Sequence, residues 1–180
     1  MMKTIRSTLL AMTVVFAGAV SPAFAAAGGN GGCVSVVATS MQSDGGAPAA
    51  GFSATRILDI DLWVLFNPGS ANRFSGDHQV EVRIFTPHGY LYQSTAIPFT
   101  YDANGKGKQR KLEDYPLPMP VRVLEPVSWS KGKELGTSVR LPVAGTLIMS
   151  HSLYGTWKAE AYVDGDPLKC AAPASFQIRP

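Results

Sequence analysis

Alternation of apolar and polar residues is the dominant pattern along this chain. In residues 79–86 (QVEVRIFT), valine and isoleucine alternate with glutamate and arginine, which is typical of a β-strand with one buried face. A proline and a glycine then mark a tight turn at 86–89, and residues 90–100 return as the partner strand. The same reasoning predicts further strands at 33–38, 57–66, 121–124, 138–141, 146–149, 157–163 and 168–178.

Two stretches lack this alternation. Residues 42–54 are rich in glycine, alanine and serine and are predicted to form a loop. Residues 102–120 carry an Asn-Gly turn, a basic run and prolines at alternate positions, which favour an extended crossover over a helix. No segment shows a convincing amphipathic helix, which disfavours a parallel sheet with crossover helices. The pattern therefore predicts an all-β fold, an antiparallel sandwich or barrel formed by a single domain over residues 33–180.

The last two predicted strands are expected to pair as a hairpin. A two-residue turn at Gly165 and Asp166 places Trp157 opposite Ala174. The facing side chains are then apolar on both strands, and a slip by one residue would bury charged groups, so the alternation fixes which face is buried. The other face carries the polar residues Lys158, Glu160, Tyr162, Lys169, Ser175 and Gln177.

Three short motifs near the C-terminus carry a family resemblance. They are LPVAGT at 141–146, GTW at 155–157 and YVDG at 162–165. Together they resemble the last hairpin of bacterial immunoglobulin-like and macroglobulin-like β-sandwich modules. The resemblance implies an immunoglobulin-like β-sandwich for this chain. It implies no particular activity, because such sandwiches host many unrelated functions.

The N-terminal segment has the organisation of a secretory signal peptide. Lys3 and Arg6 precede an apolar run at 9–20, and small residues at Ala23 and Ala25 predict cleavage after Ala25. The apolar run is shorter than the roughly 20 residues that a membrane-spanning helix needs, so no integral span is expected after processing. The sequence thus predicts a signal peptide at 1–25, a flexible glycine-rich segment at 26–32 and export to the periplasm, the cell surface or the medium.

Charge gives little reason to expect a polyanionic partner. Loss of Lys3 and Arg6 with the signal leaves 14 Lys+Arg against 13 Asp+Glu, and such a balance does not favour nucleic acid or an anionic membrane. A local basic run at 106–111 (KGKQRK) could hold an anionic polysaccharide or an acidic protein surface. Glu113 and Asp114 follow it directly, which favours a solvated hairpin tip.

Two cysteines, Cys33 and Cys170, remain after the predicted cleavage. In an exported protein such a pair is most simply explained by one disulfide, which would tie the first strand to the last. The alternative is a metal or redox pair. Neither cysteine lies in a CxxC motif or beside a histidine at ligand spacing, so the disulfide is the favoured interpretation.

Residues for catalysis or metal binding form no recognisable set. Catalytic and phosphate-binding motifs are absent from the sequence, and a hydrolase built on Ser152 and His151 is a distant third hypothesis. Asp59 and Asp61 share one face of a predicted strand, where they could serve acid–base chemistry or Ca²⁺ binding or could mark its solvent side. We therefore expect no catalytic residue, metal or cofactor, and we expect His78 to be one of several solvated histidines.

The predicted strand 57–66 offers the best candidate binding surface. One face is apolar throughout, whereas the other carries Asp61 and then Trp63 and Leu65. These last two side chains must be covered by the crossover at 102–120 or left exposed, and an exposed apolar patch marks a binding surface. Trp129, in a loop-like segment, is a second candidate. The sequence predicts a non-enzymatic protein that recognises an envelope or extracellular protein, or alternatively a carbohydrate-binding module that stacks a glycan on these tryptophans.

Overall fold

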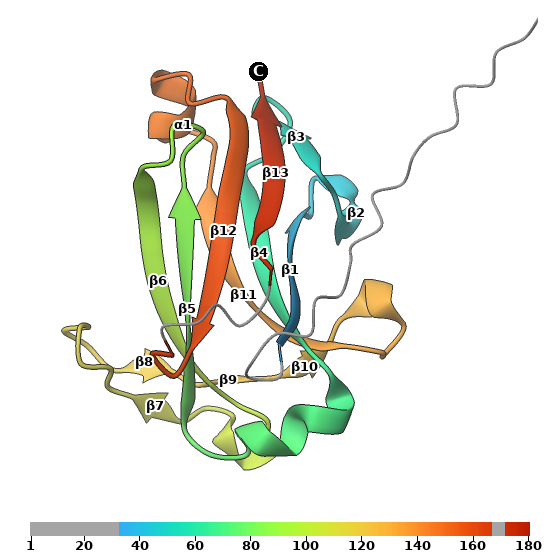
Figure 1. The fold of residues 1–180 in the computed structure, drawn as a ribbon, viewed down its shortest axis with the longest axis vertical. Coiled ribbons are helices and arrows are strands. Elements are labelled where there is room, and N and C mark those ends of the chain that lie inside the picture. Colours follow the sequence, from blue (N-terminus) through green and yellow to red (C-terminus); the bar gives the residue numbers. More distant parts are fainter. Residues whose placement is uncertain (1–32, 167–171) are drawn as a thin grey trace, which may run out of the picture.

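The computed structural model describes residues 33–166 and 172–180, and Figure 1 colours the elements along the chain. The strands are β1 (Cys33–Ser40), β2 (Ser43–Pro48), β3 (Gly51–Ser53), β4 (Asp59–Phe66), β5 (His78–Phe85), β6 (Leu91–Thr100), β7 (Gln109–Arg110), β8 (Met119–Pro120), β9 (Arg122–Val123), β10 (Glu125–Pro126), β11 (Leu135–Pro142), β12 (Gly155–Val163) and β13 (Ala174–Arg179). The helical elements are the 3-10 helices Pro68–Phe74, Ala103–Gly105 and Ser128–Ser130 and the short α-helix α1 (Leu147–Ser150).

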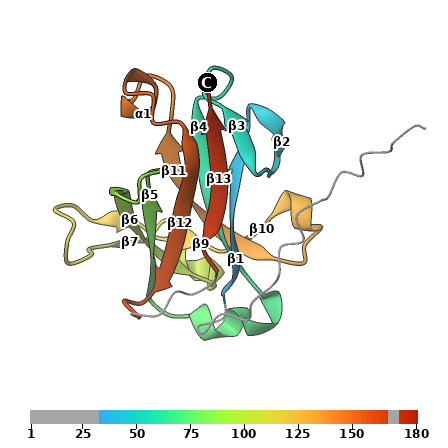
Figure 2. The same cartoon turned by 45° about the horizontal axis from the view of Figure 1, so that its top comes forward.

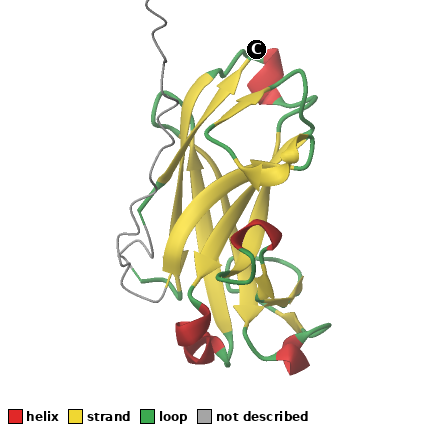
Figure 3. Ribbon diagram, turned by 90° about the vertical axis from the view of Figure 1, so that its right-hand side faces the viewer, coloured by secondary structure: helices red, strands yellow, loops and turns green. Residues whose placement is uncertain are grey.

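The longer strands form two sheets. One has the strand order β10-β11-β4-β1-β2 and the other the order β3-β13-β12-β5-β6-β9, while β7 and β8 form a small two-stranded sheet. Neighbouring strands are antiparallel except where β13 pairs with β3 and β6 pairs with β9. The two larger sheets run along the length of the molecule (Figure 1, Figure 2), and their strands are strongly curved (Figure 3). The all-β architecture predicted from the alternation is confirmed.

The core lies between the two sheets and follows from the period of two along each strand. Inward-facing side chains of both sheets join one cluster, which includes Ile60, Leu62, Val64, Phe66, Val80, Val82, Ile84, Trp157 and Phe176. Trp157 is 0% exposed. Its indole N–H donates a hydrogen bond of 2.9 Å to the carbonyl oxygen of Leu153, and its ring lies edge to face with Tyr92 at 5.1 Å between centroids. Trp157 is a core residue, as predicted.

The pairing of the C-terminal hairpin differs from the prediction by two residues. Trp157 lies opposite Phe176, and Ala159 lies opposite Ala174. The turn is formed by Asp164 and Gly165, whose φ angles of 53° and 71° are both positive. Within the described residues, the return strand pairs with β12 from Ala174 onward, and residues 167–171, which belong to the predicted return strand at 168–178, lie outside the described part of the chain. The buried face is unchanged, because a shift of two residues preserves the alternation.

The outer face of β12 is less exposed than its polar residues suggest. Glu160 is only 5% exposed and Tyr162 only 9%, although both belong to the polar face of the predicted hairpin. The Tyr162 hydroxyl donates a hydrogen bond of 2.7 Å to Glu160 Oε2, and Lys158 Nζ lies 2.7 Å from Glu160 Oε1. The Arg83 guanidinium covers the Tyr162 ring, 4.4 Å from its centroid. Burial is tolerated because these polar groups have partners.

Strand β4 begins two residues later than predicted. Leu58, which was expected on the apolar face, is 62% exposed, whereas Ile57 is 3% exposed and joins the core. The backbone N–H groups of Val143 and Ala144 both donate to the Leu58 carbonyl oxygen, at 2.9 and 3.0 Å. This contact shows that residue 58 belongs to the turn before the strand, where the alternation does not apply.

Two other predictions of secondary structure were wrong. Residues 146–149, predicted as a strand, instead contribute to α1, because the Thr146 hydroxyl caps the helix by accepting a hydrogen bond of 3.3 Å from the Ile148 N–H. Residues 42–54, predicted as a loop, contain β2 and β3. Both are short strands at sheet edges, where pairing with a neighbour decides the conformation more than local propensity does.

Candidate functional site

The structure brings together three of the four residues predicted to form a binding surface. Trp63 and Leu65 project from the outer face of β4, opposite the core-facing Leu62 and Val64. Together with Trp129 they form a small apolar cluster outside the main core, which consists of Val37, Trp63, Leu65, Val127 and Trp129. We call this cluster the Trp63 surface. Asp61 lies on the same side of β4 but is not part of it.

The two tryptophans of this surface are half-buried. Their ring centroids lie 5.3 Å apart and the ring planes meet at 83°, an edge-to-face arrangement. Beneath them, Leu65 is 2% exposed and Val127 is 3% exposed. An aromatic pair of this geometry adds stability beyond the area that it buries. The tryptophans are therefore held in place by packing while part of each indole stays accessible to solvent.

The segment that partly covers Trp63 is the connection before β11. Its residues Glu125 and Pro126 pair with β11, which places Val127 and Trp129 over the outer face of β4. The Ser130 hydroxyl closes this connection by donating to the Val127 carbonyl at 3.1 Å and accepting from the Glu134 N–H at 3.1 Å. The sequence left internal cover and exposure as alternatives. The structure shows partial cover, and the packed residues come from 125–130, not from the crossover at 102–120.

Gly136 makes room for this packing. A Cβ atom at this position would lie 3.0 Å from Trp63 Cε3, 3.0 Å from Val127 Cγ1 and 3.1 Å from Leu65 Cδ2. Such contacts are too close for an unshifted side chain. Gly136 and Val127 were not predicted as site residues. A glycine inside a strand is a known sign of close approach by a neighbouring group, and it would have been informative had the strand been predicted to begin at Leu135.

A cleft of about 360 Å³ opens beside Trp63. It is lined by residues of the connection to β10 and by the edge of β11, namely Lys106, Pro120, Val121, Arg122, Val123, Glu125, Gly136, Thr137 and Ser138. Lys106 and Arg122 form no ion pair with any residue that the structure describes. The Trp63 surface therefore adjoins a small depression whose lining combines apolar, hydroxyl and charged side chains, with two cations and one carboxylate, a combination suited to holding a partner side chain.

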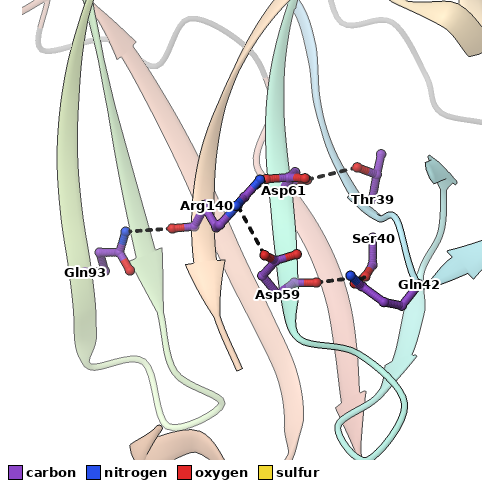
Figure 4. Close-up of polar contacts among 7 residues, drawn as sticks. All are labelled: Thr39, Ser40, Gln42, Asp59, Asp61, Gln93 and Arg140. Atoms are coloured by element: carbon purple, nitrogen blue, oxygen red, sulfur yellow. Dashed lines mark hydrogen bonds and ion pairs between the residues drawn. The ribbon is translucent and has the colours of Figure 1, made fainter. Parts of the chain in front are cut away.

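The aspartate pair forms a structural contact with one arginine (Figure 4). Arg140 Nε lies 3.2 Å from Asp59 Oδ2 and 3.2 Å from Asp61 Oδ1, and the hydrogen bond that the guanidinium donates to Asp61 raises the pKa of Arg140. The Ser40 hydroxyl lies 2.8 Å from the Asp59 carbonyl oxygen. Asp61 is only 9% exposed, so the interpretation of its side as solvent-facing was wrong. No group of three His, Cys, Asp or Glu residues suited to a metal occurs within residues 33–166 and 172–180.

The histidines do not assemble a hydrolase site in the described part of the chain. His151 Nδ1 lies 3.0 Å from the Ser150 hydroxyl, and no described carboxylate hydrogen-bonds to its ring. His78 was predicted to be solvated, but it begins β5 and lies 2.7 Å from the Asp164 carboxylate. Its ring packs against Phe74 and Phe99, at 5.3 and 5.8 Å between centroids. Among described residues, no hydroxyl or thiol hydrogen-bonds to this imidazole.

The predicted disulfide falls partly outside the described residues. Cys33 begins β1, is 3% exposed and lies opposite Phe66 of β4. Cys170 lies in 167–171, which the structure does not describe. The Cys33–Cys170 bond therefore stays a prediction.

Comparison with known proteins adds no family to this picture. No protein-family model matches the sequence, and no curated protein is similar to it. Over the part of the chain that the structure describes, none of the helices has both the length and the apolar character needed to cross a bilayer.

Proposed function

We propose that this chain is an exported, non-enzymatic immunoglobulin-like β-sandwich protein that recognises a protein partner in the bacterial envelope or outside the cell. Export is supported by the signal-like organisation of residues 1–25. The immunoglobulin-like assignment is supported by two facing β-sheets and by the motifs around the β12 strand. Recognition is assigned to the Trp63 surface.

The observation that carries the proposal is the half-buried edge-to-face pair of Trp63 and Trp129. Tryptophan is enriched among residues that dominate protein–protein binding energy, particularly where neighbouring packing limits its motion. Here Leu65, Val37 and Val127 support the pair from below, so little side-chain entropy is lost when a partner docks. The adjoining cleft offers a pocket beside the aromatic anchor.

The geometry favours a protein over a glycan as the partner. A sugar ring stacks on a flat aromatic face, and a platform for several sugars needs rings that lie roughly in one plane. The planes of Trp63 and Trp129 instead meet at 83°. The edge of one ring therefore covers part of the face of the other. The irregular, partly apolar surface that results matches side chains of a protein partner better.

Affinity capture from native envelopes tests this proposal. Immobilised wild-type protein is compared with Trp129→Ala and with Tyr90→Ala, whose side chain is 74% exposed in the turn between β5 and β6. We expect quantitative mass spectrometry to find a protein whose recovery falls with Trp129→Ala and not with Tyr90→Ala. Equal recovery on all three proteins, or glycan-array binding that is lost in Trp129→Ala, would contradict recognition of a protein by the Trp63 surface.

A further inference from the structure

A second depression lies on the other sheet, away from the Trp63 surface. It has a volume of about 920 Å³ and lies between the outer faces of β5 and β6 and the segment 110–115. The outer residues Gln79, Glu81 and Arg83 of β5 and Ser94 and Ala96 of β6 form its floor, and Tyr115 closes one side. We call it the β6 groove. Its volume lies at the upper end of the range that is usual for ligand sites.

The floor of the groove is held by paired charges. Arg83 donates from Nε to Glu81 Oε1 at 2.7 Å and from Nη2 to Glu81 Oε2 at 2.8 Å. The Ser94 hydroxyl donates to the same carboxylate at 2.6 Å, so the network joins β5 to β6. Such bidentate pairs are directional and restrict side-chain motion. The floor is therefore a fixed polar surface that does not need to reorganise when a ligand binds.

The lip of the groove is an edge of the sheet. Strand β6 pairs with β5 over most of its length, but on its other side only Phe99 and Thr100 pair with β9. The Ala96 N–H points away from β5 and donates to the Tyr115 hydroxyl at 2.6 Å. Because main-chain groups alternate along a strand, the N–H and carbonyl of Ser94 point the same way, and the Ser94 N–H has no hydrogen-bond partner among the described residues.

Two further features fit this orientation. Pro98, two residues beyond Ala96, occupies the next outward position, where a missing N–H does not disturb the pairing with β5. Tyr115 places its hydroxyl oxygen where the carbonyl oxygen of an adjacent strand would lie. The Tyr115 segment is anchored nearby by Arg110 Nη1, which donates to the His78 carbonyl at 3.2 Å, and by Leu112, which is 5% exposed. Among the described residues, the Tyr115 hydroxyl covers the Ala96 N–H, while Gln93, just before Ser94, donates from Nε2 to the Arg140 carbonyl of β11 at 3.2 Å.

We propose that the β6 groove binds an extended polypeptide segment that adds to the edge of β6 at Ser94 and Ala96. The incoming strand takes the place of the Tyr115 hydroxyl at the Ala96 N–H, and its alternate side chains stand beside Ser94 and Ala96 at the margin of the floor. Strand addition draws affinity from main-chain hydrogen bonds and specificity from alternate side chains. The described lining has five carboxylates against three Lys and Arg residues, so the groove favours a segment with basic side chains. This site does not depend on the Trp63 surface.

Synthetic octapeptides test the proposal without a known partner. The probe is the acetylated, amidated peptide KTVKTVKT, with ETVETVET as the charge control, and the readout is the ¹⁵N–¹H NMR spectrum of the full mature chain at millimolar peptide. We expect the largest shifts at the amides of Ser94 and Ala96, with weaker shifts for the glutamate peptide. Shifts confined to residues of the Trp63 surface, or no shifts at all, would overturn the proposal.

Two variants separate strand addition from simple charge attraction. Ser94→Pro removes the outward N–H, and Ser94→Ala is the matched control that keeps it. Loss of one main-chain hydrogen bond should weaken binding of the lysine peptide by about threefold or more relative to Ser94→Ala. Equal affinity of the two variants would contradict main-chain pairing. Circular dichroism and chemical denaturation check that Ser94→Pro folds.

A second substitution keeps the proposal testable if Ser94→Pro does not fold. Tyr115→Phe removes the hydroxyl that competes for the Ala96 N–H while it keeps the ring. We expect faster amide exchange at Ala96 and tighter binding of the lysine peptide, by about twofold or more. Unchanged or weaker binding would show that Tyr115 does not cover the edge in the proposed way.

Discussion

The rings of Trp63 and Trp129 lie edge to face, with centroids 5.3 Å apart and planes at 83°. This contact joins the outer face of β4 to the connection before β11. A double-mutant cycle of Trp63→Ala and Trp129→Ala should give a coupling free energy of about 0.5–1.5 kcal/mol, the usual value for such aromatic pairs. Urea denaturation of the four proteins measures it. Additive effects within about 0.3 kcal/mol would mean that the pair does not interact in solution.

Comparison with Trp157 tests whether the Trp63 surface is separate from the core. Trp157 is 0% exposed, and its truncation to alanine should cost about 3–5 kcal/mol of unfolding free energy. Trp63→Ala should cost less, because its side chain is half-buried and packs on a small cluster. If both substitutions destabilise the fold equally, Trp63 acts as a core residue and the assignment of a binding surface fails.

Gly136→Ala should disturb the same surface from beneath. The added Cβ would lie about 3.0 Å from atoms of both Trp63 and Val127, and overpacking of this kind costs about 1–3 kcal/mol of unfolding free energy. Gly51→Ala is the matched control, because the nearest described atom to its Cβ lies 3.6 Å away. Chemical denaturation compares the two. An equal effect at both positions would show that Gly136 does not limit this packing.

The sequence predicted which faces are buried but not how distant segments meet. Val80, Val82 and Trp157 were assigned to the core because alternation is a local property of a strand. The opposition of Trp157 and Phe176 was missed, because the prediction took the register from an assumed two-residue turn at Gly165 and Asp166. No local pattern predicts a contact between segments as far apart in the chain as those that meet in the two sites.

The helix at 147–150 and the segment 125–130 that partly covers Trp63 were also missed, because a local pattern does not specify either of them. The residues of α1 include leucine and isoleucine, which also suit a strand, and the Thr146 cap decided between the two conformations. The candidate residues Trp63, Leu65 and Trp129 were found from their apolar character. Asp61 was also expected on this binding surface, but it lies outside the cluster and pairs with Arg140. Its partner Arg140 comes from β11, whose pairing with β4 the alternation alone does not specify.

Glu81 should make stability depend on pH in the acidic range. Its hydrogen bond with Arg83 lowers the pKa of the carboxyl below the ordinary value of a glutamate. A group with a lowered pKa in the folded state contributes stability above the unfolded pKa, and this contribution is lost as the pH falls through the folded pKa. Glu81→Gln should therefore flatten the acid decline of the unfolding free energy, by less than about 1 kcal/mol because the pair is partly exposed.

Denaturation curves collected between neutral and acidic pH measure this effect. Glu125→Gln is the control for loss of one carboxylate, since Glu125 is exposed and forms no ion pair with a described residue. A decline that is identical in wild type and Glu81→Gln would show that the Glu81–Arg83 pair contributes nothing to the pH dependence.

The disulfide can be tested by mass mapping of the native, non-reduced protein. We expect a peptide that joins Cys33 to Cys170 and no free thiol. Removal of a native disulfide from a small secreted domain typically costs about 2–5 kcal/mol, so Cys170→Ala should lower the unfolding free energy by that amount. Two free thiols in native material would contradict the prediction and leave Cys33 a buried residue of β1.

Recognition of a protein through the Trp63 surface is tested most directly by the affinity of the captured partner for Trp63→Ala and Trp129→Ala. Isothermal titration compares wild type, Trp63→Ala, Trp129→Ala and the control Tyr90→Ala, after denaturation has shown that each variant is folded. The account predicts that each tryptophan substitution raises the Kd about fivefold or more, which corresponds to about 1 kcal/mol, and that Tyr90→Ala leaves it unchanged. Wild-type affinity in both tryptophan variants would contradict recognition through the Trp63 surface.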